Sequence, residues 1–194
     1  MPRMSKAEGI VEKLKACDEG TRYYFWMLEE LIRKVSRPEP ALAYCFQRIE
    51  SAQRVALYAL LMRKYRTDSQ LAWEAIDRLD ITRTNFPAFY HVLSGRKFPK
   101  ELRDILSPAE AVRDRITHGK VSKTGTVLTA IGTCLDYAEA LNAKVWTDAG
   151  FRPFGQLRGV TSSSRPQLEK EISRLVIRGL GLENAKTPPA LAEN

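Results

Sequence analysis

The feature that most constrains the fold of this chain is the recurrence of apolar residues at steps of three and four positions along almost every segment. This spacing places apolar side chains on one face of an α-helix, whereas a half-buried strand needs strict alternation. The longest example is 38–65, which opens with proline and is long enough to be a central helix. No convincing strand or repeat interrupts the pattern, so the sequence predicts an all-α helical bundle. The predicted buried stripe of the central helix is Leu42, Cys45, Phe46, Ile49, Ala52, Val55 and Ala56.

Six further segments carry the same period, and several have recognisable ends. The pattern Ser107-Pro108-x-Glu110 is typical of a capping box with proline in the first turn, so we expect a helix to start there. Gly119 is expected to end that helix, because glycine readily adopts the left-handed conformation. The predicted helices are 21–35, 67–79 with an Asp or Thr cap, 98–106, 107–118, 124–146 with small residues suited to close packing, and 166–182, opened by Ser164 or Arg165.

Composition changes after the long helix 124–146. Residues 147–165 are rich in Gly, Ser and Arg and are expected to form a long surface loop. We expect a single domain over 1–182, with its core at about 22–146 and a loop-plus-helix extension at about 147–182. The polar segment 183–194 is expected to be a disordered tail.

The overall composition is that of an ordinary globular protein, with 44% hydrophobic and 28% charged residues among 194. The first residues lack the apolar run of a signal peptide, and no segment approaches the roughly 20 apolar residues that span a bilayer. We therefore expect a cytoplasmic protein without a membrane partner. The three cysteines, Cys17, Cys45 and Cys134, lack the short spacing of a zinc site and are expected to be small buried apolar groups.

The formal net charge of +8 favours contact with a polyanion, because phosphate backbones attract lysine and arginine without demanding sequence specificity. Charge alone does not establish nucleic-acid binding, since many basic proteins bind none. A specific site has to be found in particular residues.

One such site is suggested by helix 107–118. On a helical wheel Ala109, Val112 and Ile116 fall within about 60° of one another and define the core face. Asp114 and His118 are about 40° apart and nearly opposite that face, so they are expected to point outward.

The chemistry expected at the end of this helix is proton transfer beside a phosphate. Arg113 lies beside the core stripe, and its length would let it reach the same surface spot as Asp114 and His118. The helix dipole and Asp114 would both favour protonated His118, and arginine offers a planar set of donors to phosphate oxygens. No cluster of metal ligands is visible in the sequence, and no cofactor is expected. A nucleophile from the substrate itself, such as the 2′-hydroxyl of RNA, is therefore attractive.

The stretch VRDRITHG, followed by another long helix in an all-α chain, resembles the HEPN superfamily, the higher eukaryotes and prokaryotes nucleotide-binding domains. The family signature is Arg-x4-His with a polar second residue, which Arg113, Asp114 and His118 match, although asparagine is commoner than aspartate in the second place. The resemblance implies a homodimer whose paired motifs form a metal-independent endoribonuclease site. It equally implies that the chain is a noncatalytic nucleotide-binding, RNA-binding or adaptor module, and an antitoxin or other protein partner is possible.

Further residues are candidates for RNA contact. Arg115 and Lys120 flank the motif, and Arg152 and Arg158 lie in FRPFGQLRG among two phenylalanines that could stack on single-stranded bases. The alternative is that these phenylalanines anchor the loop to the bundle. Glu50, on the central helix, could support Arg113 or could be a solvated charge.

A helix-turn-helix DNA-binding motif within residues 80–102 is a competing interpretation. The distance along the chain from Leu71 and Ala72 to Ile81 is too long for the compact turn of such a motif, and Pro87 would interrupt the recognition helix beyond its first turn. The alternative is a turn and a short helix that packs through Phe86, Phe89 and Tyr90. His91, the only other histidine, is expected to serve packing or hydrogen bonding.

Overall fold

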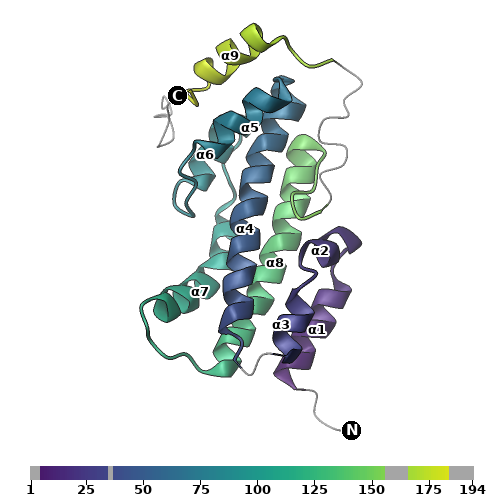
Figure 1. Ribbon diagram of the computed structural model, residues 1–194, viewed down its shortest axis with the longest axis vertical. Coiled ribbons are helices and arrows are strands. Elements are labelled where there is room, and N and C mark those ends of the chain that lie inside the picture. The colour runs from purple at the N-terminus through teal and green to yellow at the C-terminus, as the bar shows by residue number, and fades with distance from the viewer. Residues whose placement is uncertain (1–4, 35–36, 156–165, 184–194) are drawn as a thin grey trace. The chain divides into compact units, whose positions relative to one another are not determined.

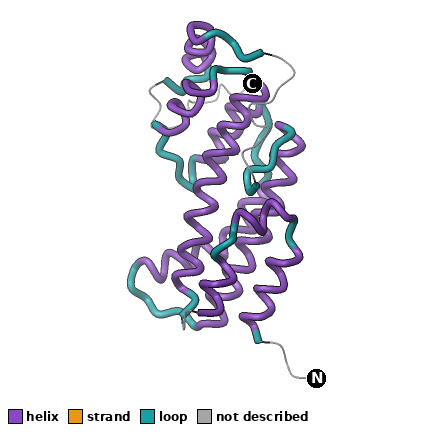
Figure 2. Tube along the Cα trace, turned by 45° about the vertical axis from the view of Figure 1, so that its right-hand side comes forward, coloured by secondary structure: helices purple, strands orange, loops and turns teal. Residues whose placement is uncertain are grey.

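The computed structural model describes residues 5–34, 37–155 and 166–183, which form helices joined by loops (Figures 1 and 2). The predicted all-α helical bundle is confirmed, since the described residues contain nine α-helices, one π-helix and no strand. None of the helices in these ranges is both long enough and apolar enough to cross a membrane. The elements are α1 Lys6–Ala16, α2 Glu19–Tyr24, α3 Leu28–Lys34, α4 Glu39–Leu60, η1 Leu61–Tyr65, α5 Ser69–Asp77, α6 Phe86–Ser94, α7 Lys100–Thr117, α8 Thr124–Ala149 and α9 Lys170–Gly179.

The chain divides into two compact units. The first, called unit 1, contains the chain up to Ile49, the segment Pro99–Ala143, and Phe154 with Gly155. The second, called unit 2, contains Glu50–Phe98, Lys144–Pro153 and helix α9. Helices α4 and α8 contribute residues to both units, so each unit has its own part of these two helices in its core.

The central helix α4 buries the stripe that the sequence predicts. Every one of the seven predicted residues, from Leu42 to Ala56, is at most 5% exposed. Within unit 1, Cys45 of α4 and Cys134 of α8 are fully buried neighbours. Burial, followed by the adjacent thiol, raises the pKa of Cys45, so it stays neutral and packs as a small apolar group.

Helix α1 is an element that the periodicity analysis missed. Its start is a capping box: the Ser5 hydroxyl accepts from the Glu8 amide, and the Glu8 carboxylate accepts from the Ser5 amide. The helix packs closely on α8 at Gly132, where an added Cβ would stand 3.0 Å from the Ile10 methyl. The prediction that small residues of the long helix 124–146 allow close packing is confirmed at Gly132.

The helix predicted over 21–35 is broken into α2 and α3 by a turn. Two side chains of α4 contact the end of α2: the Arg48 guanidinium and the Tyr44 hydroxyl both donate to the Tyr24 carbonyl, at 3.1 and 3.4 Å. The next residue, Phe25, is fully buried and stacks on Phe154 with ring centroids 5.6 Å apart. These distant contacts end the helix at a place where the local sequence would continue it.

The separate helices predicted over 98–106 and 107–118 are wrong, because α7 runs unbroken from Lys100 to Thr117 with Pro108 inside it. Leu106 and Ala109 lie three residues apart and are 4% and 0% exposed. Their shared buried face favours a continuous helix and outweighs the hydrogen bond that proline removes.

In unit 2 the predicted cap and the predicted short helix are both present. The Asp68 carboxylate caps α5 by accepting from the amides of Gln70 and Leu71. Pro87 occupies the first turn of α6, where a missing amide costs nothing. The packing interpretation of this helix is confirmed, since its three aromatic residues Phe86, Phe89 and Tyr90 are at most 1% exposed.

Helix α9 begins at Lys170, four residues later than the predicted start at 166. Residues 166–169 are held in a non-helical conformation by Arg66, whose guanidinium donates twice to the Pro166 carbonyl at 3.0 and 2.7 Å. The Arg66 carbonyl also accepts from the Leu168 amide at 2.7 Å. The backbone amides therefore find partners outside a helix. Helices α5 and α9 lie side by side in unit 2 (Figure 1).

The loop predicted over 147–165 begins later than expected, since Thr147–Ala149 form the last turn of α8 and Gly150 ends it. Arg158 and the rest of 156–165 lie outside the described residues. So does 184–194, where the tail is expected.

Candidate functional site

The end of α7 is built as the sequence predicts. His118 is the C-terminal capping residue, and its amide donates to the Asp114 carbonyl at 3.0 Å. Gly119 follows with φ of +72°, which confirms its expected left-handed conformation. The amides of Gly119 and Lys120 then donate to the carbonyls of Ile116 and Arg115, both at 2.9 Å. This double closure fixes the backbone on which the candidate site stands.

Four basic or titratable side chains are exposed where α7 passes into α8. We call this group the basic turn. The same turn carries Val121, whose side chain is 90% exposed and stands between two lysines. Such a concentration of cations attracts anionic ligands. The basic turn consists of Arg115, His118, Lys120 and Lys123.

Arg113 and Asp114 are less exposed than His118. Both are half-buried, and the Arg113 guanidinium lies over the Phe46 ring of α4, 4.9 Å from its centroid. This cation–π contact anchors Arg113 on α4. The predicted meeting of Arg113, Asp114 and His118 at one spot stays a prediction.

The core face that the helical wheel predicts for α7 is only partly buried. Ala109 is fully buried as predicted, whereas Val112 and Ile116 of the same stripe are half-buried. The core face is therefore shallower toward the end of α7. This shallowness leaves the last turn accessible to a ligand.

Two further candidates, Glu50 and His91, fall in unit 2. Glu50 is exposed on α4. His91 is half-buried on α6, and its Nδ1 atom is buried without a hydrogen-bond partner in the described residues.

In the loop after α8 the two phenylalanines are buried, whereas the arginine is exposed. Phe151 is 5% exposed and Phe154 is fully buried, where it packs against Phe25 and Tyr24 of unit 1. The anchoring interpretation of the phenylalanines is confirmed, and neither is available to stack on a base. Arg152 remains exposed.

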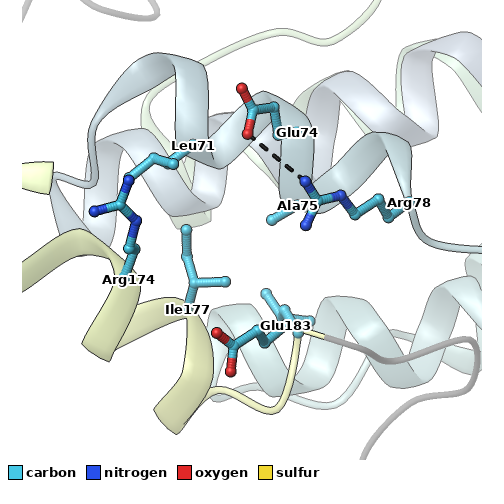
Figure 3. Close-up of a pocket in the computed structure, with 8 residues that line it drawn as sticks. Leu71, Glu74, Ala75, Arg78, Arg174, Ile177 and Glu183 are labelled. Carbon is cyan, nitrogen blue, oxygen red and sulfur yellow. Dashed lines mark ion pairs between the residues drawn. The ribbon is translucent and has the colours of Figure 1, made fainter. Parts of the chain in front are cut away.

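Two hollows that the sequence does not reveal lie among the described residues. In unit 2 a pocket of about 260 Å³ lies between α5 and α9, with apolar walls and charged edges (Figure 3). The edge charges are satisfied by partners, since Arg78 pairs with Glu74 at 3.8 Å and Glu183 with Arg178 at 2.7 Å. The lining residues are Leu71, Glu74, Ala75, Arg78, Arg174, Ile177, Leu182 and Glu183.

The second hollow belongs to unit 1 and measures about 260 Å³. Lys6 of α1 stands at one side, and Val112 of α7 forms part of another. It depends on α1, the helix that the periodicity analysis missed. Its remaining lining residues are Pro108, Gly125, Thr126, Thr129, Ala130 and Thr133.

No family model, curated protein or solved structure matches this chain. Within the described residues, no group of three or more His, Cys, Asp or Glu side chains is placed so that it could hold a metal ion.

Proposed function

We propose that the protein is a HEPN-like RNA-binding endoribonuclease that works without a metal ion through Arg113, Asp114 and His118. The observation that carries the proposal is the exposed His118 within the basic turn at the end of α7. An imidazole can both accept and donate a proton, so an exposed histidine in a turn that also carries three cations suits proton transfer beside a phosphodiester. The net charge of +8 favours the same ligand.

The proposed reaction uses the 2′-hydroxyl of RNA as the nucleophile. The 2′-oxygen attacks phosphorus while a neutral imidazole of His118 takes its proton, and the bond from phosphorus to the 5′-oxygen breaks. A protonated His118 of a second copy donates a proton to the departing 5′-oxygen. Arg113 stabilises the charge on the phosphate oxygens, and Asp114 orients the pair. The products are a 2′,3′-cyclic phosphate and a 5′-hydroxyl.

The proposal includes a homodimer, because one histidine in each copy supplies the two proton-transfer roles. A monomer at tens of micromolar by light scattering would contradict this part of the mechanism.

The test is cleavage of a single-stranded RNA by the His118→Ala variant. We expect cleavage to fall by about 100-fold or more, the range that general acid-base catalysis supplies, while the fold persists because the side chain is exposed. Wild-type activity should persist in EDTA and should leave 2′,3′-cyclic phosphate ends. The matched control is Lys123→Ala, which removes a cation of the basic turn but keeps the His118 imidazole, so RNA binding should weaken while cleavage of bound RNA persists. Equal RNA binding by the wild type and by His118→Ala, with no RNA cleaved by the wild type, would overturn the nuclease proposal.

The second candidate function is a noncatalytic RNA-binding or adaptor module. The stacking of Arg113 on Phe46 favours it, because a packing role is sufficient reason for an arginine at this position. The substitution Arg113→Lys distinguishes the two candidates. If Arg113 is catalytic, the variant should lose more of its RNA cleavage than of its RNA binding. If Arg113 serves packing, the variant should mainly lose stability.

A further inference from the structure

All three tryptophans of this chain are exposed, with exposed fractions of 65% for Trp26, 44% for Trp73 and 55% for Trp146. Tryptophan is usually well buried, and an exposed indole offers a flat apolar face on which a ligand can stack. Trp146 has an additional feature. The Arg152 guanidinium lies 5.5 Å from the centroid of its ring, within the range of a cation–π contact.

The loop that carries Arg152 is shaped to bring it back to Trp146. Gly150 ends α8 with φ of +62°, and its amide donates to the Trp146 carbonyl at 2.8 Å. A side chain at Gly150 would be strained at this φ. The loop then turns so that a residue six positions after Trp146 lies against its ring.

Arg152 is also held from both sides. Its neighbours Phe151 and Pro153 are buried, and so is Phe154, so Arg152 is the exposed residue of this stretch. The buried Asn142 amide accepts from the Phe154 amide at 2.8 Å and donates to its carbonyl at 3.1 Å. The backbone on both sides of Arg152 is thus fixed, which lowers the entropy cost of binding a ligand.

The electrostatics of this segment suit an anion. The carboxylate in Lys144–Pro153 is that of Asp148, whose side chain is 2% exposed and bound by Lys144 at 2.6 Å and Arg96 at 3.0 Å. Its negative charge is compensated and buried. Asp148 therefore does little to repel a phosphate that approaches the exposed Arg152.

We propose that Trp146 and Arg152 form a binding site for one nucleotide of single-stranded RNA, with the base stacked on the indole and the phosphate bound by the guanidinium. Every base has a π-face, so the site would tolerate any sequence, and it needs an unpaired base. The inference rests on the proposed RNA binding, but it adds a contact separate from the residues of the cleavage site. Trp73 differs, because its ring packs edge-on against Tyr58 at 5.4 Å.

The experiment measures binding of a short single-stranded 2′-O-methyl oligouridylate, which lacks the nucleophile of the proposed cleavage. Trp146→Ala should weaken binding about 5- to 150-fold, the range for loss of one base–aromatic stack, and Trp146→Phe should weaken it less. Arg152→Ala should weaken binding and lower the slope of log affinity against log salt by about 0.7, whereas Arg152→Lys should keep the slope. Trp73→Phe is the matched control and should bind as the wild type does.

A second readout follows Trp146 directly. In the double variant Trp26→Phe/Trp73→Phe, Trp146 is the remaining tryptophan, and stacking of a base should quench its fluorescence. Unchanged affinity in Trp146→Ala and Arg152→Ala, without quenching, would overturn this site while leaving RNA binding and cleavage intact. Wild-type protein that binds no single-stranded RNA would instead overturn the proposed function, and this site with it.

Discussion

At the scale of single residues, Asn142 of α8 holds three parts of unit 1 together. Its Nδ2 donates to the Thr21 hydroxyl and to the Phe154 carbonyl, both at 3.1 Å, and its Oδ1 accepts from the Phe154 amide. All three residues are at most 2% exposed. The hydrogen bonds therefore form away from water, where a missing partner is costly.

Asn142→Ala should destabilise the protein by about 2–4 kcal/mol, because it removes three buried hydrogen bonds and leaves the backbone of Phe154 unsatisfied. Urea unfolding followed by circular dichroism measures the change. Thr129→Ala, which removes an exposed hydroxyl on the same helix, should change stability by less than about 0.5 kcal/mol. Equal effects of the two substitutions would contradict the role of this network.

Asp148 makes stability depend on pH. Burial by itself would raise the pKa of this carboxyl, but the hydrogen bonds from Lys144 and Tyr90 and the charges of Lys144 and Arg96 outweigh it and lower the pKa. A lowered pKa in the folded state means that the stabilisation is present above the pKa of the unfolded chain, about 3.9, and is lost as pH falls through the folded value.

Asp148→Asn should lower stability at neutral pH by about 3 kcal/mol, because Lys144, 18% exposed, loses its charge partner. It should also remove part of the acid-induced loss seen in the wild type below about pH 4. Asp136→Asn is the matched control on the same helix, since its pair with Lys13 is exposed and worth about 0–1 kcal/mol. Thermal unfolding at several pH values between acid and neutral measures the loss of stability at neutral pH and the smaller loss on acidification. Parallel curves for Asp148→Asn and the wild type would contradict the linkage.

At the scale of elements, Pro108 shows how packing overrides a local signal. It lies exposed inside α7, where it supplies no amide to the helix ladder. Pro108→Ala should restore that hydrogen bond and raise stability by about 1–3 kcal/mol, since proline is the poorest residue in a helix interior. Urea unfolding measures the gain. A loss of stability would indicate that proline at position 108 is needed for the packing of Leu106 and Ala109.

At the scale of the whole molecule, the positive charge dominates the expected association with RNA. Affinity should fall steeply as salt rises from about 50 to 200 mM, because each arginine or lysine that binds a phosphate releases a counterion. Fluorescence anisotropy with labelled single-stranded RNA measures the slope. A flat response over this range would point to a ligand other than a polyanion.

Features that depend on neighbours within a turn of helix could be predicted from the sequence. The stripe of α4, the Asp68 cap and the Gly119 terminus are of this kind, since each follows from residues one to four positions apart. The capping box at Ser5 is equally local and could have revealed α1. His118 is exposed where the wheel predicts.

Features set by contacts between distant residues were decided by the tertiary structure. Tyr44 and Arg48 end α2 by bonding to its last carbonyl, and contacts of Arg66 with 166–168 place the start of α9 at Lys170. Burial of Leu106 and Ala109 keeps α7 helical on both sides of Pro108. The same holds for the site after α8, where burial of two phenylalanines leaves Arg152 beside Trp146. A local pattern states what a segment prefers by itself. The burial of apolar surface and the pairing of backbone groups across tens of residues decide which preference survives, because those energies exist only once the chain has folded.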